Sequence, residues 1–166
     1  MVIAIRDARV EDAEDMVGIL NPIIEARIYT ALDTIFSVEQ QRAFVRSFPQ
    51  RGIFLVAADT TSNRVVGLQD VSPFGDFTPA FDHVGVIGTF VDLNRRREGI
   101  ATQLFAATFD AASKKGYEKF FTYVRADNDA ALQTYLRHGF RVVGTAQRQA
   151  KIDGRYIDEI VIEKVF

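Results

Sequence analysis

Residues 83–105 read HVGVIGTFVDLNRRREGIATQLF, a β-rich run that leads through a short polar loop into a helical pattern. The run 83–91 predicts a strand, since Val, Ile, Thr and Phe dominate it. Gly85 and Gly88 interrupt this run, and a glycine inside a strand marks a bulge or a close approach of another backbone or a ligand. We therefore expect a strand that is bulged or has such a close neighbour.

The helical pattern that begins at Ile100 ends at Lys114-Lys115-Gly116, where two cations and a glycine form a stop signal. A further β-rich run follows at 119–124. A strand, a helix and a strand in this order form one crossover, so the strands 83–91 and 119–124 are expected to run parallel. Because ligands bind at the carboxyl ends of parallel strands, we expect a site where these two strands end.

The remaining segments predict more elements of both kinds. Further strands are expected at 2–6, 53–58, 64–68, 141–149 and 155–165, and further helices at 37–48, at 128–138 and around the apolar positions in 16–24. Pro22 is expected to bend or end the first helix, and Ser37 with Gln40 forms a capping box at the start of the second. This order predicts one α/β (α+β) layered domain over residues 1–166, with a mixed sheet of about seven strands and helices on both faces.

Composition argues against several classes of protein. The 166 residues include 20 basic and 22 acidic side chains, so no excess of positive charge is available for a nucleic-acid backbone. There is no Cys, and His83 and His138 form no HExxH pair, so we expect neither a disulfide nor a metal site. No apolar run reaches the roughly 18 residues that span a bilayer, so no membrane is expected as a partner. Residues 1–9 lack a leader pattern, and the expected location is cytoplasmic.

The loop before Ile100 has the features of an anion site. Gly99 and Ala101 let a ligand approach the backbone, and the first turn of the helix exposes unpaired N–H groups at its positive end. The three arginines 95–97 add charge and phosphate-binding capacity. The alternative is that these arginines are solvated loop charges and that Gly99 is a turn residue. Neither GxxxxGK[ST] nor GxGxxG is present, which argues against a nucleoside triphosphate loop and a dinucleotide fingerprint.

A second motif is expected to face the same crevice. It is DNDAALQTYLRHGF at residues 127–140, directly after the strand 119–124. Asn128 has an alternative role as the N-cap of its helix, and Tyr135 has one as a core aromatic that packs on Phe140.

The two motifs together resemble those of the GNAT superfamily of N-acetyltransferases. RREGIA at residues 96–101 matches the signature [RQ]xxGx[GA], and NxxAxxxYxxxGF at residues 128–140 matches the second motif of that superfamily. The resemblance covers roughly residues 83–140. The segments 21–25, 72–74 and 154–158 are similar to its phosphinothricin-acetyltransferase-like branch.

The resemblance implies where acetyl coenzyme A (acetyl-CoA) would bind. Backbone groups of the strand 83–91 would hydrogen-bond the pantetheine arm, amides at the start of the helix would hold the pyrophosphate, and Tyr135 would lie near the sulfur. The implied cofactor-binding residues are Thr89, Phe90, Val91, Arg96, Arg97, Glu98, Gly99, Ile100, Ala101, Thr102, Asn128 and Tyr135. The family often has Gly at the position of Arg97, a departure that would alter affinity while keeping the amide donors.

Acyl transfer to an amine requires two proton movements. A proton leaves the nitrogen, and a proton reaches the sulfur as the thiolate departs. Tyr135 is the candidate catalytic acid, because its phenol holds a proton at neutral pH. Many relatives have Glu as the base at the position that corresponds to Val86. We therefore consider water held by strand carbonyls, or one of the carboxylates Glu25, Asp82 and Asp158, each of which is also readily explained as a solvated or structural group.

The sequence thus predicts an enzyme, an acetyl-CoA-dependent N-acetyltransferase (acyltransferase) whose acceptor is the primary amine of a small molecule, an amino acid or a related xenobiotic. The candidate substrate contacts are Glu25, Tyr29, Phe74, Phe77 and Tyr156, of which Phe74 and Phe77 are equally explained as core or loop anchors. One alternative is a protein or peptide N-acetyltransferase, although the segment 72–82 is expected to block a peptide channel. Another is a non-catalytic acyl-CoA-binding sensor, consistent with Val86. The resemblance is compatible with a homodimer.

Overall fold

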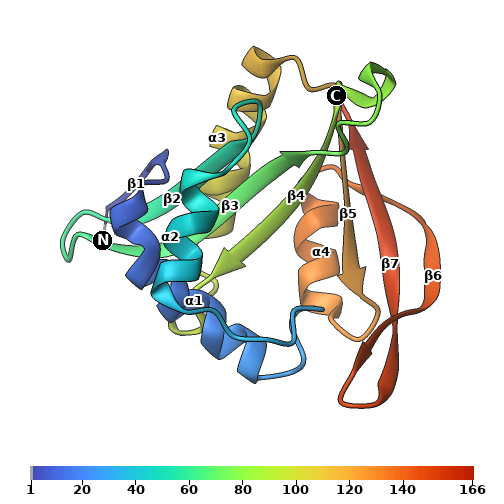
Figure 1. The fold of residues 1–166 in the computed structure, drawn as a ribbon, viewed down its shortest axis with the longest axis horizontal. Coiled ribbons are helices and arrows are strands. Elements are labelled where there is room, and N and C mark those ends of the chain that lie inside the picture. The colour runs from blue at the N-terminus through green and yellow to red at the C-terminus, as the bar shows by residue number, and fades with distance from the viewer. Residues whose placement is uncertain (1) are drawn as a thin grey trace.

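A computed structural model describes residues 2–166 of the chain. Met1, the first residue of the stretch 1–9 discussed above, lies outside the described part. Seven strands form one sheet in the order β1-β2-β3-β4-β5-β7-β6 (Figure 1). The strands are β1 Ile3–Asp7, β2 Ile53–Asp59, β3 Arg64–Pro73, β4 Val84–Val91, β5 Lys119–Arg125, β6 Arg141–Ile152 and β7 Arg155–Val165. The α-helices are α1 Ala13–Glu25, α2 Val38–Arg46, α3 Ile100–Lys115 and α4 Asp129–Arg137. Short 3₁₀ turns lie at Val10–Asp12, Pro79–Phe81 and Leu93–Arg95.

The strands β4 and β5 are the parallel pair, and every other neighbouring pair in the sheet is antiparallel. This confirms the crossover expected from the sequence. Pairing between β4 and β5 is limited to Val84–Val86 against Lys119–Phe121. Beyond these residues the two strands diverge, and Figure 1 shows a V-shaped opening between them with α4 behind it. One backbone edge of residues 87–91 therefore has no strand beside it.

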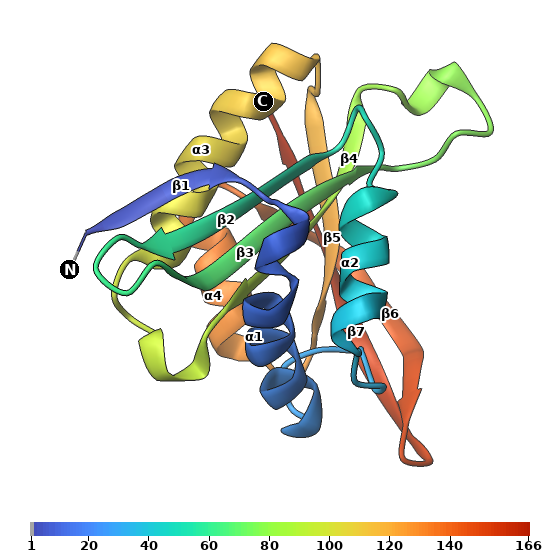
Figure 2. The same cartoon turned by 60° about the vertical axis from the view of Figure 1, so that its left-hand side comes forward.

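Helices cover both faces of the sheet, as the sequence predicts. Figure 2 shows α1 and α2 on one face, with α3 and α4 on the other. Successive side chains of β2 point to opposite faces of the sheet and so contribute to both cores. Leu55 belongs to the core under α3, whereas Phe54 and Val56 belong to the core under α1. In the first core, Phe105 of α3 and Phe120 of β5 are fully buried. Each face of the sheet thus has its own apolar layer.

Helix ends follow the local signals. Ser37 Oγ accepts from Gln40 N at 3.1 Å and Gln40 Oε1 accepts from Ser37 N at 2.8 Å, which confirms the capping box. Gly116, with a φ of +79°, ends α3, as the stop signal predicts. No helix within residues 2–166 combines the length and the apolarity that a membrane crossing demands.

The structure decides between the alternatives expected for β4 and Pro22, and it corrects the expected end of β3. Of these alternatives, the bulge in β4 is absent, because the register of β4 against β3 is continuous from Gly85 to Val91, whereas the pairing of β2 with β3 is irregular opposite Ala57/Ala58. The glycines of β4 instead allow close neighbours, as a Cβ on Gly85 would lie 2.4 Å from Val71 Cγ1. The strand β3 runs to Pro73 rather than residue 68, since β4 pairs with its second half. Pro22 does not end α1, which continues for three more residues to Glu25.

Candidate active site

The opening between β4 and β5 contains a cavity of about 820 Å³. Thr89, Phe90 and Val91 line it from the edge of β4 that no strand covers. Backbone N–H and C=O groups on such an edge are available to an extended ligand. The cavity therefore offers a ligand a strand-like row of hydrogen-bonding groups.

The start of α3 forms one end of this cavity. Gly99, Ile100, Ala101 and Thr102 all line it. The first intrahelical acceptor is the carbonyl of Gly99, which bonds Gln103 N at 3.2 Å, so the preceding amides have no partner within the helix. A Cβ on Gly99 would meet nothing within 4 Å, and this residue has a φ of +76°. The amides thus face open space at the positive end of a helix dipole, an arrangement that binds anions.

The three arginines of the loop have different environments. Arg95 forms ion pairs with Asp59 at 3.3 Å and with Glu98 at 2.9 Å, so it stabilises the loop. Arg96 and Arg97 line the cavity and are exposed. Arg97 has a φ of +65°, in the left-handed region that favours glycine, which explains why glycine suits this position. The expectation of solvated loop charges thus fits Arg96 and Arg97 in this structure, and their position beside the amides also suits an anion.

Asn128 lines the cavity and also caps α4. Its Oδ1 accepts from Ala131 N at 3.2 Å, and its Nδ2 donates to the carbonyl of Tyr29 at 3.1 Å. The capping role expected as an alternative is therefore confirmed. Tyr29 lines the cavity as well, with the guanidinium of Arg96 4.1 Å from its ring centroid. Asn128 thereby joins the loop after α1 to the site.

Tyr135 lies on the wall of the cavity and is 8% exposed. Its hydroxyl donates to Thr89 Oγ1 at 3.0 Å, and Gln69 Nε2 donates to the same oxygen at 2.8 Å. Burial raises the pKa of Tyr135 to about 12, so the phenol keeps its proton at neutral pH. Its ring also packs on Phe140 at a centroid distance of 5.1 Å, which confirms the expected core contact. Tyr135 is thus a core aromatic whose hydroxyl forms a hydrogen bond on the wall of the cavity.

A second cavity, of about 360 Å³, lies on the face of the sheet that α1 and α2 cover. Its lining consists of Leu20, Leu32, Phe36, Gln40, Gln41, Phe44, Leu68, Asp70 and Phe90. Leu32 and Phe90 line both cavities, so the two spaces adjoin at these residues. Asp70 is the single charged side chain of this lining.

Asp70 is a site residue that the sequence reasoning missed. It lies on β3 directly opposite Gly88, and its Oδ1 is 3.1 Å from where a Cβ on Gly88 would be. Its carboxyl is partly accessible through the cavity but otherwise surrounded by protein, and this burial raises its pKa to about 7. A carboxylate between the buried residues Leu68 and Val71 is the sequence signal that could have revealed it.

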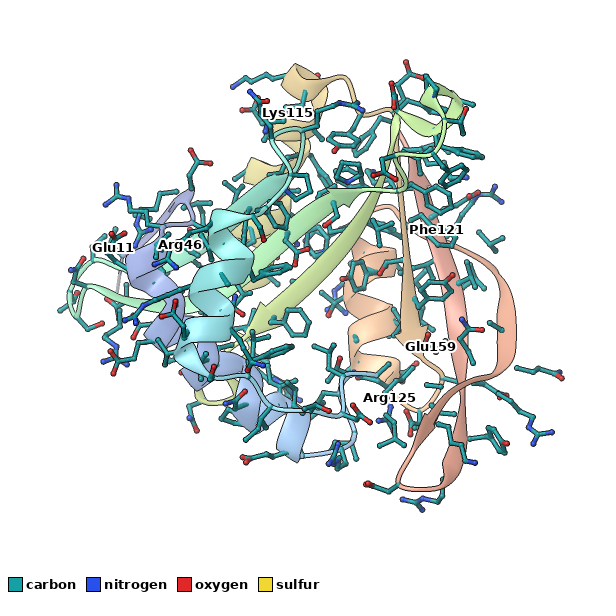
Figure 3. All side chains as sticks on the ribbon, in the orientation of Figure 1. Glu11, Arg46, Lys115, Phe121, Arg125 and Glu159 are labelled. Carbon is teal, nitrogen blue, oxygen red and sulfur yellow. The ribbon has the colours of Figure 1, made fainter. Side chains whose placement is uncertain are left out.

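Arg125 and Glu159 lie together near the end of β5 where the opening is widest (Figure 3). Arg125 donates to the carbonyls of Arg27 at 2.8 Å and Thr30 at 3.2 Å, which holds the loop after α1 against the sheet. Burial raises the pKa of Glu159, whereas the positive charge of Arg125 opposes that shift. These two residues also belong to the lining of the first cavity.

Several residues expected at the site line neither cavity. Glu98 is paired with Arg95, and Glu25 is exposed at the end of α1. Tyr156 is half-exposed beneath the guanidinium of Arg148. The residues concerned are Glu25, Phe74, Phe77, Asp82, Glu98, Tyr156 and Asp158. Among the expected substrate contacts, Tyr29 is the one that lines a cavity.

The loop after β3 explains why Phe74 and Phe77 are remote. Phe74 N donates to the carbonyl of Val84 at 3.0 Å, at the end of β4 that is paired with β5. The cavity lies at the other end of β4, and Figure 2 shows the loop projecting away from the sheet. Phe74 packs on Phe81 and Phe121 instead. The segment 72–82 therefore contributes no residue to either cavity.

The chain is similar in sequence to known proteins. The sequence profile of the acetyltransferase (GNAT) family matches residues 24–140. The phosphinothricin N-acetyltransferase of Streptomyces coelicolor is 26% identical over 158 residues, which cover 94% of this chain and 92% of that protein. The L-amino acid N-acetyltransferase AaaT of Escherichia coli is 26% identical over 88 residues, 52% of this chain and 54% of that protein. The first of these relatives agrees with the branch that the segments 21–25, 72–74 and 154–158 resemble.

Solved structures share the fold. A phosphinothricin acetyltransferase of Sinorhizobium meliloti in complex with acetyl-CoA superposes with a TM-score of 0.89 at 17% identity, over 100% of this chain and 89% of that one. The ribosomal-protein-alanine N-acetyltransferase of Brucella melitensis gives a TM-score of 0.90 at 23% identity, over 98% and 99% of the two chains. Because the profile match spans well over half of the sequence and includes the loop and helix that form the site, the chain belongs to the acetyltransferase (GNAT) family.

Proposed function

We propose that this acetyltransferase moves an acetyl group from acetyl-CoA to the primary amine of a small molecule, an amino acid or a related xenobiotic, by direct attack of the nitrogen. The observation that carries the proposal is the convergence on one cavity of an uncovered strand edge, free helix amides and the hydroxyl of Tyr135. The relative from Streptomyces coelicolor acts, by its name, on phosphinothricin, and the one from Escherichia coli acts on L-amino acids.

The cavity fits the parts of acetyl-CoA. Amides from residues 97–102 would hold the pyrophosphate, because all of these residues except Glu98 line the cavity and no Cβ at Gly99 obstructs them. The edge of β4 at residues 89–91 would bind the pantetheine arm as an added strand would. When bound, acetyl-CoA supplies an acetyl group activated as a thioester. The chain itself supplies the position of that group and the proton movements.

Tyr135 would donate a proton to the departing sulfur. Its raised pKa keeps the phenol protonated over the whole neutral range. The bond with Thr89 joins two hydroxyl groups, and either hydroxyl can act as the donor. Because Thr89 Oγ1 already accepts from Gln69, its own proton is available to Tyr135, and the phenol proton is then free for the sulfur.

The second cavity supports an acceptor with an apolar body. Its lining holds Asp70 as the one charged side chain and contains neither Lys nor Arg. An acid group on the acceptor would find no cation there, whereas aliphatic or aromatic carbon would bury apolar surface against Leu20, Phe36 and Phe44. Among candidate acceptors we therefore favour amines with a single apolar side chain.

Amine-dependent release of thiol from acetyl-CoA tests the proposal. The panel contains apolar amino acids, aralkylamines, phosphinothricin and a short peptide with a free N-terminus. We expect turnover with at least one small amine and a higher kcat/KM for apolar acceptors than for phosphinothricin. Turnover with the peptide alone would favour the peptide N-acetyltransferase alternative. Binding of acetyl-CoA without thiol release for any amine would favour the sensor alternative. The single domain over 1–166, the homodimer and the cytoplasmic location remain predictions.

A further inference from the structure

We propose that Asp70 is the base that accepts the proton lost by the acceptor nitrogen as the C–N bond forms. This inference rests on the function proposed above and assigns a role that the sequence left open at Val86. It follows from the face of the sheet on which Asp70 lies, from the cavity that it lines and from the charges around it.

Asp70 and Val86 point to the same face of the sheet. Side chains alternate along a strand, so Val86, Gly88 and Phe90 share one face of β4. Asp70 is directly opposite Gly88 in an antiparallel pair, and directly opposite residues project to the same side. The neighbouring strand thus supplies a carboxylate next to the position where many relatives have their acidic residue. Gly88 lacks a Cβ, which leaves Asp70 Oδ1 room above β4.

The location also suits the reaction. Phe90, two residues after Gly88, lines both cavities. The uncovered edge of residues 87–91 belongs to the cavity that would hold the thioester, and Asp70 belongs to the adjoining one that would hold the acceptor. An amine that approaches the thioester from the second cavity therefore passes the Asp70 carboxylate.

The surroundings leave Asp70 without a compensating charge. No ion pair or side-chain hydrogen bond to Asp70 is found within residues 2–166. The elements packed around it contribute Leu20 from α1, Leu32 and Phe36 from the following loop, Gln40, Gln41 and Phe44 from α2, Leu68 from β3 and Phe90 from β4, none of which titrates. The titratable group with which it interacts is Tyr135, whose pKa the charge of Asp70 raises. A carboxyl with a pKa of about 7 is ionised enough to accept a proton at neutral pH and basic enough to hold it.

The proton and electron balance is complete with the groups at hand. The acceptor ammonium first loses a proton to solvent, and the neutral nitrogen then uses its lone pair to form the C–N bond. The nitrogen proton goes to the Asp70 carboxylate. The C–S bond breaks with its electron pair on sulfur, which takes the proton of Tyr135. A proton that passes from Asp70 through water to the Tyr135 phenolate restores both side chains.

Other carboxylates fit less well. Glu25, Asp82 and Asp158 line neither cavity. Glu159 lines the first cavity but not the second one, which would hold the acceptor. Burial raises the pKa of Glu159, and the positive charge of Arg125 directly opposite works against that shift. Glu159 is therefore the alternative that the experiment must separate from Asp70.

The test compares the pH dependence of kcat for the wild type, Asp70→Asn, Glu159→Gln and Asp82→Asn, at saturating acetyl-CoA and saturating amine. In the wild type we expect kcat to rise with pH up to about 7 and then to level off. Asp70→Asn is expected to lower kcat by about 10²–10⁴-fold and to remove this rise. Its acetyl-CoA affinity, measured by calorimetry, should stay within a factor of about two because Asp70 lies outside the first cavity. Asp82→Asn is the matched control with an unchanged profile, since Asp82 pairs with Arg51 in a remote loop.

Each outcome decides between the claims. A wild-type kcat and pH profile in Asp70→Asn would overturn the base assignment and leave the proposed function standing. A reduced kcat that keeps the rise near pH 7 would show a structural role for Asp70, and loss of the rise in Glu159→Gln alone would transfer the role to Glu159. Both results overturn the inference. No turnover by the wild type with any amine would overturn the proposed function, and the base assignment with it.

Discussion

The hydroxyl of Tyr135 lies 3.0 Å from Oγ1 of Thr89, and this hydrogen bond joins α4 to β4 across the opening of the sheet. Gln69 Nε2, on β3, donates to the same Thr89 Oγ1 at 2.8 Å. Three elements thereby fix the phenol beside the strand edge that would bind the pantetheine arm. The position of Tyr135 is thus determined by packing and by hydrogen bonds within the protein.

Tyr135→Phe should lower kcat by about 10²-fold or more while changing the Kd for acetyl-CoA by much less, because the lost group acts on the sulfur only as it departs. Steady-state kinetics and calorimetry measure the two effects. Tyr117→Phe is the matched control, since Tyr117 is equally buried and donates to the carbonyl of Arg51 outside the site. Equal kcat values for Tyr135→Phe and the wild type, under conditions in which chemistry limits the rate, would rule out the acid role.

Gly99→Val should abolish measurable binding of acetyl-CoA. The new side chain would occupy the open space in front of the helix amides, and a β-branched residue is strained at a φ of +76°. Gly116→Val separates these two effects, because Gly116 has a φ of +79° and open space around it but lies at the far end of α3. Both variants should be less stable than the wild type, but only Gly99→Val should fail to bind acetyl-CoA. Wild-type affinity in Gly99→Val would contradict the position assigned to the pyrophosphate.

Arg97→Gly and Arg97→Ala separate backbone strain from charge. Both remove the guanidinium, so both should bind acetyl-CoA more weakly than the wild type, and more so at low salt. The glycine variant should be more stable than the alanine variant by about 1 kcal/mol, because only glycine adopts a φ of +65° without strain. Urea denaturation measures the difference. Equal stability of the two variants would show that the left-handed conformation carries no strain here.

Asp70 should make the protein less stable as the pH rises from about 4 to about 7. In the unfolded chain this carboxyl loses its proton near its ordinary pKa of 3.8, whereas the folded state retains the proton up to about pH 7. The folded state gains stability by holding this proton. That gain is complete below the pKa of the unfolded chain and is lost as the pH rises through the pKa of the folded state. The loss amounts to at most about 4 kcal/mol, reduced by water in the cavity. In urea denaturation at pH 4.5 and 8, Asp70→Asn should lack this loss; an identical pH dependence in both proteins would contradict it.

Local signals explain what could be predicted. The stop of α3 at Gly116, the cap of α4 at Asn128 and the loop before Ile100 each depend on a few consecutive residues, and all three lie where the sequence indicates. The family motifs 96–101 and 128–140 are of the same kind, since they occupy the ends of two adjacent elements.

Pairing between distant segments explains which features could not be predicted from the sequence. Asp70 was missed because Gln69 and Asp70 interrupt the apolar run and suggest that β3 ends, whereas backbone bonds to β4 continue the strand to Pro73 whatever the side chains are. Phe74 was placed near the acceptor because the chain pattern does not show which end of β4 separates from β5. That depends on the pairing of Val84–Val86 with β5, a long-range contact.

Thermal denaturation with and without acetyl-CoA tests the central claim, that the cavity between β4, α3 and α4 binds this molecule through the amides before Gln103. At a concentration of about 100 times Kd, a ligand adds about 2.7 kcal/mol of stability. For a chain of this size each kcal/mol raises Tm by about 2–4 °C, so we expect a rise of several degrees for the wild type and none for Gly99→Val. No rise for the wild type at millimolar acetyl-CoA, or the same rise in Gly99→Val, would contradict the claim.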